Sequence, residues 1–269
     1  MNDTVCSPVI ARLKAIRHVV MDMDGTIYSG SRLFPTTIPF LRQLDAARIG
    51  YTFLTNNSSV GTADYQVKLH RMGIDVELDQ IFTSTHSVIA YLRRRHPEIR
   101  KIFVLGTDSF KNELENAGFL ITFGEPDAVI MGFHTELEYR QLCKTAYWIR
   151  QGKPWFASHP DLECPTDAQL VLVDCGAVIE CLHSVTGRRP DKVLGKPSCE
   201  MLDPIMQRYG LKKEEILMVG DRYNTDMELA RNAGTPAVMI AAAPDRIGGD
   251  ETILCAVRNL GELGALLNA

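Results

Sequence analysis

The stretch HVVMDMDGTIYSG, residues 18–30, indicates both a fold and a chemistry. Its first residues form an apolar run that is too short for a helix and is typical of a buried parallel strand. The run ends in Asp22 and Asp24, followed by Gly25, which allows a sharp turn. Residues i and i+2 of a strand point to the same side, so both carboxylates should project from the strand's carboxyl end, where parallel sheets bind ligands. One carboxylate could then act as a nucleophile while the other transfers a proton.

Six further apolar runs repeat this pattern, and amphipathic segments separate them. The runs are YTFLTN (51–56), KIFVLG (101–106), DAVIMGF (127–133), PWFAS (154–158), EILMVGD (215–221) and AVMIA (237–241). Among the helices expected between them, one should stop at Gly50 and another should be capped by Asp108. Alternating strands and helices predict βαβ units and therefore an α/β fold with parallel strands.

Three more motifs lie where a predicted strand ends or a helix begins. TFLTNNS (52–58) offers Thr55 and Asn56, whose hydroxyl and backbone N–H groups suit a phosphate oxygen. LGKPS (194–198) holds Lys196, which can neutralise phosphate charge. ILMVGDRYNTDM (216–227) supplies Asp221 and Asp226, hard oxygen ligands of the kind that Mg²⁺ prefers. Each motif alone also fits an ordinary turn or helix cap, but together they supply what a magnesium phosphoryl-transfer site needs.

Composition excludes several classes of protein. The 269 residues carry a net charge of −4, which gives no basic surface for nucleic acid or an anionic membrane. Seven cysteines in irregular spacing, without a CxxC pair, argue against a disulfide framework or a zinc site. The first residues lack the apolar core of a signal peptide, and no apolar run approaches the roughly 20 residues that span a bilayer. We therefore expect a cytoplasmic protein with reduced thiols.

The four motifs, in this order, closely resemble those of the haloacid dehalogenase superfamily. The strings DMDGTIYSG, FLTNNSS, ASHPD, VTGRRP, LGKPS and VGDRYNTDM are similar to those of its NagD-like branch of 4-nitrophenyl phosphatase-like enzymes. The resemblance implies a three-layer, doubly wound, mostly parallel sheet with an inserted α/β cap domain of the C2 type. The expected core comprises residues 1–83 plus 187–269, and the expected cap comprises residues 84–186.

The resemblance also implies a role for each motif residue in the reaction. Asp22 would be the nucleophile, and Asp24 would be the general acid and then the base for water. Mg²⁺ would be held by the Asp22 carboxylate, the Asp24 backbone carbonyl and Asp221. Asp226 would support the metal site through water or through Lys196.

Substrate binding would fall to residues from both expected domains. Thr55, Asn56 and Lys196 would bind the phosphoryl group, and Asp161 of the expected cap could contact the rest of the substrate. The implied activity is hydrolysis of a small phosphorylated metabolite, with 4-nitrophenyl phosphate as an artificial substrate. Relatives often form dimers through the cap, so a homodimer of that kind is a further expectation.

Three alternative functions use the same fold. A phosphotransferase or phosphomutase would pass the phosphoryl group to another acceptor. A regulatory or binding homologue would have weak turnover or none, although Asp22, Asp24 and Lys196 are all present. A dehalogenase would need neither Asp24 nor Mg²⁺, so the paired aspartates disfavour that activity.

Overall fold

The computed structural model describes residues 3–166, 169–243 and 251–269. The chain divides into two compact units, and each unit is built from more than one segment of the sequence. The first unit comprises 1–54, 66–81 and 197–269, and the second comprises 55–65 and 82–196. The expected cap, 84–186, lies inside the second unit, but its assignment as a cap stays a prediction. In the part of the chain that the structure describes, no helix combines the length and apolarity needed to cross a membrane.

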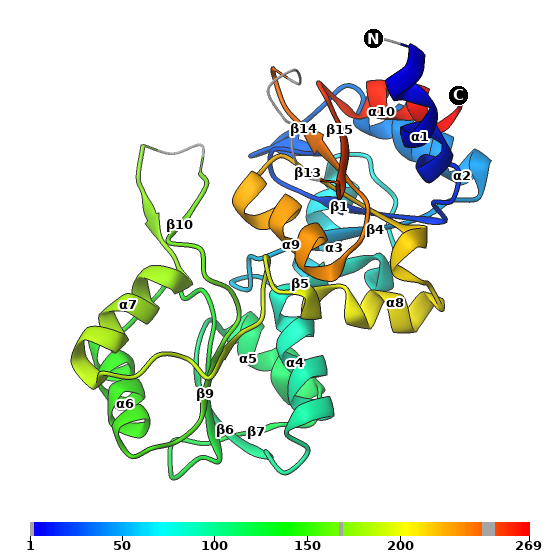
Figure 1. Cartoon of the computed structure of the whole chain (residues 1–269). Coiled ribbons are helices and arrows are strands. Elements are labelled where there is room, and N and C mark those ends of the chain that lie inside the picture. The colour runs from blue at the N-terminus through cyan, green and yellow to red at the C-terminus, as the bar shows by residue number, and fades with distance from the viewer. Residues whose placement is uncertain (1–2, 167–168, 244–250) are drawn as a thin grey trace. The chain divides into compact units, whose positions relative to one another are not determined.

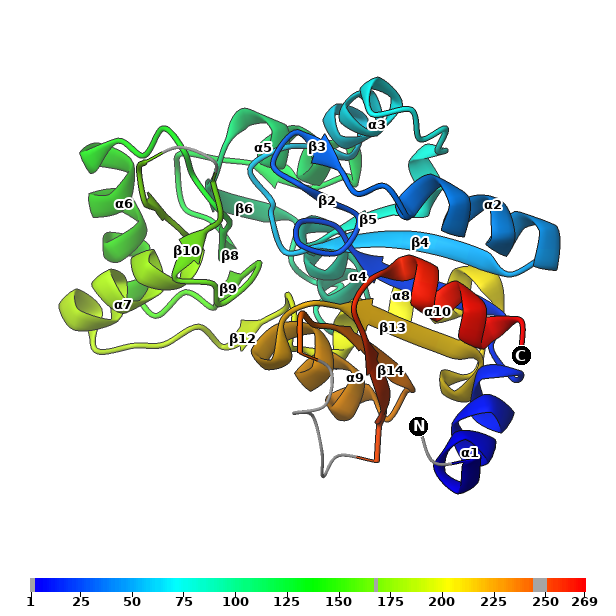
Figure 2. The same ribbon diagram turned by 90° about the horizontal axis from the view of Figure 1, so that it is seen from above.

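The sheet of the first unit has six strands in the order β15-β14-β13-β1-β4-β5 (Figures 1 and 2). The pairings of β1 with β13 and β4, and of β14 with β13 and β15, are parallel. All residues of β1 and β13 are buried, as expected for strands covered on both faces. The strand bounds are His18–Asp22 (β1), Gly50–Thr55 (β4), Ile81–Thr83 (β5), Ile216–Gly220 (β13), Ala237–Ile240 (β14) and Ile253–Val257 (β15).

Strands β4 and β5 lie on one side of β1 in the sheet. Strands β13, β14 and β15, which come later in the chain, lie on its other side. Right-handed crossovers then place the connecting helices on opposite faces of the sheet. The crevice at the carboxyl ends of β1 and β13 is therefore a topological switch point, where open α/β sheets bind ligands. The helices are α1 (Asp3–Leu13), α2 (Thr37–Ala47), α3 (Thr62–Arg71), α8 (Asp203–Tyr209), α9 (Glu228–Ala233) and α10 (Leu260–Leu267).

The second unit is a sheet of five strands in the order β12-β9-β8-β6-β7, with two helices on each face. Alternate residues of β6 face opposite sides, as strand geometry requires. Ile102 joins a core with helices α4 and α5, whereas Phe103 joins a core with α6 and α7. The bounds are Ser84–Arg95 (α4), Lys101–Leu105 (β6), Asp108–Asn116 (α5), Leu120–Ile121 (β7), Ala128–Met131 (β8), Tyr139–Arg150 (α6), Trp155–Ala157 (β9), Cys175–Thr186 (α7) and Lys192–Val193 (β12).

Short elements complete both units. Two antiparallel pairs are β2 (Tyr28–Ser29) with β3 (Arg32–Leu33), and β10 (Glu163–Cys164) with β11 (Leu172–Val173). Single turns of 3₁₀-helix span Leu78–Gln80 (η1), Cys199–Met201 (η2) and Lys213–Glu215 (η3), and a π-helical turn spans Tyr223–Met227 (η4).

Two local predictions are wrong. Helix α2 ends before Gly50, and Arg48 is the residue that adopts the left-handed conformation after it, with φ 56°. Gly50 instead begins β4, where a Cβ would lie 2.6 Å from Nδ1 of His18, so close packing explains the glycine. Asp108 is inside helix α5, and the cap is Thr107, whose side chain accepts a hydrogen bond from the N–H of Phe110.

The cysteines whose side chains are described are all free thiols, which agrees with the absence of a disulfide framework. Cys6 falls outside the described side chains.

Candidate active site

Asp22 is the last residue of β1 and lies at the switch point of the first unit. The residue as a whole is 8% exposed, which is low for an aspartate at a strand end. Met23 turns into the core at 1% exposure, so the next residue that points to the side of Asp22 is Asp24, which is partly exposed. The expected pair of carboxylates on one side of the strand end is therefore consistent with the burial pattern.

Asp221 follows β13 and packs directly on the turn after β1. A Cβ on Gly25 would overlap the Asp221 carboxylate, and Gly25 also has φ 89°, where side chains are strained. The hydroxyl of Thr26 lies 3.5 Å from Oδ1 of Asp221. This explains the glycine of the sequence DGT, because the missing side chain of Gly25 leaves the space that the Asp221 carboxylate fills.

Asp226 enters the same area from the π-helical turn η4. It is fully buried, its Oδ2 accepts a hydrogen bond from the N–H of Arg222 at 3.1 Å, and its side chain packs on Gly220. A Cβ on Gly220 would overlap that side chain. Turns of π-helix are rare and occur often at functional sites, because they redirect a side chain that a regular helix would point elsewhere.

The carboxylates of Asp22, Asp221 and Asp226 thereby form a cluster, with one oxygen of each within 4.8 Å of the others. We call these three residues the acidic cluster. Two like charges 4 Å apart repel by about 4 kcal/mol at an effective dielectric constant of 20. A divalent cation would offset that repulsion, and carboxylate oxygens are the ligands that Mg²⁺ prefers. The donor set therefore fits magnesium.

The phosphate-binding candidates all belong to the second unit. Thr55 ends β4, and its Oγ1 accepts a hydrogen bond from the N–H of Asn57 at 3.2 Å. Asn56 is 6% exposed and Lys196 is 3% exposed. The Asn56 amide bonds to both backbone groups of Lys196, so the structure brings together two motifs that lie 140 residues apart.

Asp161 also meets Asn56. Both of its carboxylate oxygens accept from Nδ2 of Asn56, at 3.2 and 3.1 Å. The sequence suggested a contact between Asp161 and the substrate, and that contact stays a prediction. What the structure adds is a protein partner for this carboxylate.

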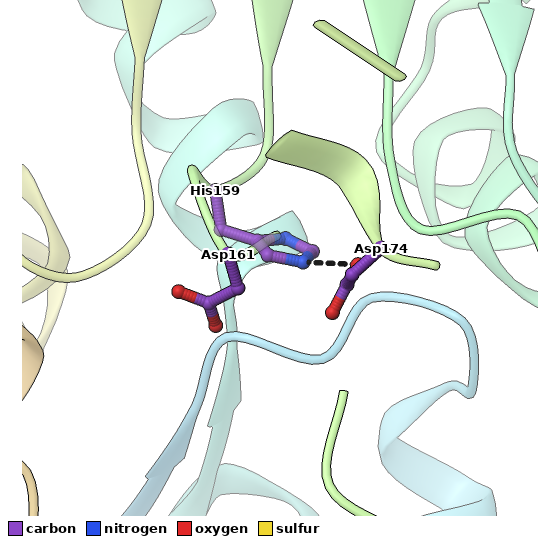
Figure 3. Close-up of side chains that lie close together, drawn as sticks. All are labelled: His159, Asp161 and Asp174. Atoms are coloured by element: carbon purple, nitrogen blue, oxygen red, sulfur yellow. Dashed lines mark hydrogen bonds and ion pairs between the residues drawn. The ribbon is translucent and has the colours of Figure 1, made fainter. Parts of the chain in front are cut away.

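Two residues that the sequence analysis did not single out lie beside Asp161. His159 is fully buried, and its Nε2 lies 2.8 Å from Oδ1 of Asp174, the N-cap residue of α7 (Figure 3). Its Nδ1 lies 2.7 Å from the hydroxyl of Ser158. An aspartate before the helical pattern CGAVIECL is a capping signal that could have identified Asp174 in advance.

His159, Asp161 and Asp174 have the spacing of a metal site, with ligand atoms within 4.8 Å of one another. Each of these atoms, however, already has a protein partner in the described contacts. Burial raises the pKa of the neighbouring Cys175 to about 12, so this thiol stays protonated and is not a nucleophile. We call His159, Asp161 and Asp174 the neutralised cluster, and we read it as structural.

Comparison with protein families gives two matches. Residues 19–120 match the haloacid dehalogenase-like hydrolases, and residues 193–243 match a second HAD-hydrolase-like family. Among curated proteins, the chain is 28% identical over 229 residues to the acid sugar phosphatase of Staphylococcus epidermidis, covering 85% of this chain and 87% of that protein.

Solved structures agree with these matches. The 4-nitrophenylphosphatase of Thermotoga maritima is 35% identical with a TM-score of 0.88, covering 94% of this chain and 98% of that one. NagD of Escherichia coli K-12 is 25% identical with a TM-score of 0.82, covering 92% and 98%. A glycerol phosphate phosphatase of Mycobacterium tuberculosis, in complex with magnesium, is 27% identical with a TM-score of 0.78, covering 84% and 68%.

Proposed function

The chain belongs to the haloacid dehalogenase-like hydrolases, in the NagD-like branch, and is a phosphatase; on this premise we propose that Asp22 attacks small phosphate monoesters with the help of Mg²⁺. The observation that carries the proposal is the acidic cluster. Three carboxylates from β1, the end of β13 and the following turn converge at the switch point of the sheet. Carboxylates this close repel one another, and a divalent cation would offset that repulsion and also attract a phosphoryl group.

In the first step, an Asp22 oxygen bonds to phosphorus and the bond from phosphorus to the leaving-group oxygen breaks. The Asp24 carboxylic acid donates its proton to that oxygen, so the product leaves as a neutral alcohol. The phosphoryl group stays on Asp22 as an acyl phosphate. Thr55, the backbone of Asn56 and Lys196 are proposed to bind its oxygens.

In the second step, the Asp24 carboxylate takes a proton from a water molecule, whose oxygen bonds to phosphorus. The bond between phosphorus and the Asp22 oxygen breaks, which releases inorganic phosphate and restores both aspartates to their starting states. The same residue acts first as an acid and then as a base, as general acid–base catalysis in two stages requires.

The residues proposed to hold Mg²⁺ are Asp22, the backbone carbonyl of Asp24 and Asp221, with Asp226 in support. When bound, the cation supplies charge neutralisation for the carboxylates and the phosphoryl oxygens. A relative in complex with magnesium supports this choice, as does the donor set of the acidic cluster.

The proposal is tested with purified protein and 4-nitrophenyl phosphate. We expect release of 4-nitrophenol with Mg²⁺ present and loss of that release in excess chelator, restored when Mg²⁺ is added back. Undiminished turnover in chelator would contradict the metal role. A covalent intermediate is tested separately by trapping acid-stable label on Asp22 from a ³²P-labelled substrate.

The role of Asp24 is tested by the choice of leaving group. Asp24→Asn cannot donate its proton, so hydrolysis of an alkyl phosphate should fall much further than hydrolysis of 4-nitrophenyl phosphate, whose leaving group needs little protonation. An equal loss for both substrates would contradict the acid role.

The names of relatives suggest the substrate class. Sugar phosphates and glycerol phosphate are the first candidates, because relatives are named as phosphatases for them. A screen of phosphorylated metabolites, ranked by kcat/KM, would identify the preferred substrate. No described residue favours phosphoryl transfer to an acceptor other than water.

A homodimer through the second unit also stays a proposal. That unit carries most of the large apolar side chains with high exposure, among them Phe123, Tyr139, Leu170 and Val171. Their burial in a second copy would explain them. Analytical ultracentrifugation would decide between a monomer and a dimer.

A further inference from the structure

We propose that the Asn56 side chain positions Lys196 for catalysis instead of binding the phosphoryl group, and that Asp161 orients Asn56. The inference rests on the proposed function, because the orientation of Lys196 matters to a reaction only if the chain is a phosphatase. It assigns a different role to two predicted site residues. Asn56 and Asp161 become positioning residues that act through Lys196.

The first observation is that the Asn56 amide engages the backbone of Lys196 on both sides. Its Oδ1 accepts from the N–H of Lys196 at 2.7 Å, and its Nδ2 donates to the carbonyl of Lys196 at 3.0 Å. We call these two bonds the Lys196 clamp. They fix the peptide groups before and after the lysine Cα, and therefore the direction in which its side chain starts.

The second observation is that the Asn56 amide has no donor left for a substrate. An amide nitrogen carries two protons, and here the acceptors are the Lys196 carbonyl and the Asp161 carboxylate. The opposite amide orientation would set its oxygen against both of these acceptors, so the assignment follows from the partners. The backbone N–H of Asn56 is then the group that this residue could offer to a phosphate.

The third observation is that the clamp needs the glycine of LGKPS. A Cβ on Gly195 would lie 2.7 Å from Oδ1 of Asn56, 2.6 Å from the carbonyl of Ser158 and 2.5 Å from Cβ of His159. Any side chain here would push the Lys196 backbone away from Asn56. The glycine before the lysine is therefore explained by the close approach of the two segments.

The fourth observation is that Asp161 is itself held in place. Its carbonyl accepts from the N–H of Gly176 at 2.7 Å, in the first turn of α7, and a Cβ on Gly176 would overlap the carbonyl of Pro160. Asp174 caps helix α7, and its carboxylate bonds to the buried His159. The pair of His159 and Asp174 thus fixes the start of α7, the start of α7 holds Asp161, and Asp161 orients the Asn56 amide.

A further hydrogen bond and deep burial hold the backbone of Asn56 in place. The Ser84 hydroxyl donates to the Asn56 carbonyl at 2.5 Å, and the residue is almost completely buried. A group this enclosed suits the task of positioning a neighbour. Misplacement of a catalytic group by about 1 Å can cost roughly 100-fold in rate.

The test compares two substrates that differ in the leaving group, 4-nitrophenyl phosphate and glycerol phosphate. We expect Asp161→Ala to lower kcat for both by the same factor of about 10 to 100, since a hydrogen bond to a charged group is lost. KM should change little. Asp161→Asn should retain most of the activity, because its carbonyl oxygen can still accept from Asn56.

A swap of the two side chains makes the test specific. Asn56→Asp should lose activity, because two carboxylates then face each other, and adding Asp161→Asn should recover part of the loss. Two independent substrate contacts would give additive effects instead. The matched control is Glu163→Gln, an exposed carboxylate two residues further along, which should behave as wild type. Circular dichroism checks that each variant is folded.

Three results would overturn the inference. The first is an Asp161→Ala variant whose preference between the two substrates changes more than tenfold, which would make Asp161 a substrate contact. The second is no recovery in the double variant. The third is wild-type protein without turnover, which overturns the proposed function and the catalytic meaning of the clamp together, and is seen before any variant is compared.

Discussion

The acidic cluster and the neutralised cluster each bring three side chains within the same distance of one another, but they differ in the chemical groups that those side chains carry. In the first, oxygens of Asp22, Asp221 and Asp226 lie within 4.8 Å of one another, and all three possible ligand atoms belong to carboxylates. In the second, the spacing is the same, but one possible ligand atom is a nitrogen of His159, which lies 2.8 Å from the Asp174 carboxylate. Spacing alone therefore does not identify a metal site.

What separates the two clusters is the free energy that each arrangement contributes to folding. Like charges that are brought together lower stability unless a ligand offsets them, whereas matched and buried polar groups lower stability only when a partner is removed. Removing a carboxylate should therefore lower stability less in the acidic cluster than in the neutralised cluster. Variants of Asp22, Asp174 and Asp221 test this difference, and His18 adds a buried histidine whose partner is a hydroxyl; the largest expected effect comes first.

Asp22→Asn should abolish hydrolysis of 4-nitrophenyl phosphate, with a loss of roughly 10⁴-fold or more, because the nucleophile is removed. Its melting temperature without Mg²⁺ should fall less than that of Asp174→Ala, since the change also removes repulsion among three neighbouring carboxylates. Steady-state kinetics and thermal unfolding measure the two effects. A strongly destabilised Asp22→Asn variant would show that the acidic cluster also has a structural role.

Asp174→Ala should lower the free energy of unfolding by about 3–5 kcal/mol, because the buried His159 loses its partner and α7 loses its cap. Urea denaturation followed by circular dichroism measures this change. The control is Asp75→Ala on the surface, which should stay within about 0.5 kcal/mol of wild type. A similar small effect for Asp174→Ala would remove the distinction between the clusters.

His18 shows what happens when a buried histidine has a hydroxyl partner and no carboxylate. Its Nε2 lies 2.7 Å from Oγ1 of Thr52, its ring packs 4.6 Å from that of Tyr209, and burial lowers its pKa to about 4. The unfolded chain, with an ordinary pKa near 6.5, binds this proton first as pH falls. Stability should therefore be complete above about pH 6.5 and decline toward pH 4, by about 3 kcal/mol in all.

The variant His18→Gln tests the assignment, because glutamine can still bond to Thr52 but does not titrate. Its free energy of unfolding should vary less with pH between 6.5 and 4 than that of the wild type. If the two pH profiles have the same slope in this range, the acid sensitivity arises elsewhere in the chain.

Mg²⁺ should raise the melting temperature of the wild type, and the gain should vanish in Asp221→Asn. At a concentration 100 times the dissociation constant, a ligand that binds only the folded state adds about 2.7 kcal/mol. Thermal unfolding with and without Mg²⁺ measures the shift. Asp161→Asn should keep the full shift, and loss of the shift in that variant would mean that Mg²⁺ binds the neutralised cluster instead.

The regular elements of the fold were predictable from the sequence because they depend on local patterns. All seven apolar runs are strands, including β1 and β13, which carry the first and fourth motifs. In the two main sheets, strands β5, β7, β12 and β15 were not predicted. The first three are only three, two and two residues long, which gives no period to detect.

The contacts within the site were less predictable than its residues. Motif spacing identified Asp22, Asp221 and Asp226 as candidates, and the structure brings them together. The bond between Asn56 and Lys196 joins positions 140 residues apart, and the pairing of His159 with Asp174 depends on how α7 begins. Such contacts are products of tertiary packing, so no local pattern in the chain encodes them.

The close contact of Gly176 with the chain at Pro160 and Asp161 also has a consequence for protein engineering. A segment whose backbone is packed this closely tolerates few substitutions, so random mutation of residues 158–161 should yield mostly inactive proteins. Strand β10 starts only two residues later and pairs with β11, and exposed apolar side chains lie in or beside this pair, among them Leu162 and Val173. Libraries meant to alter substrate preference should therefore vary these strands and leave the glycine and its neighbours untouched.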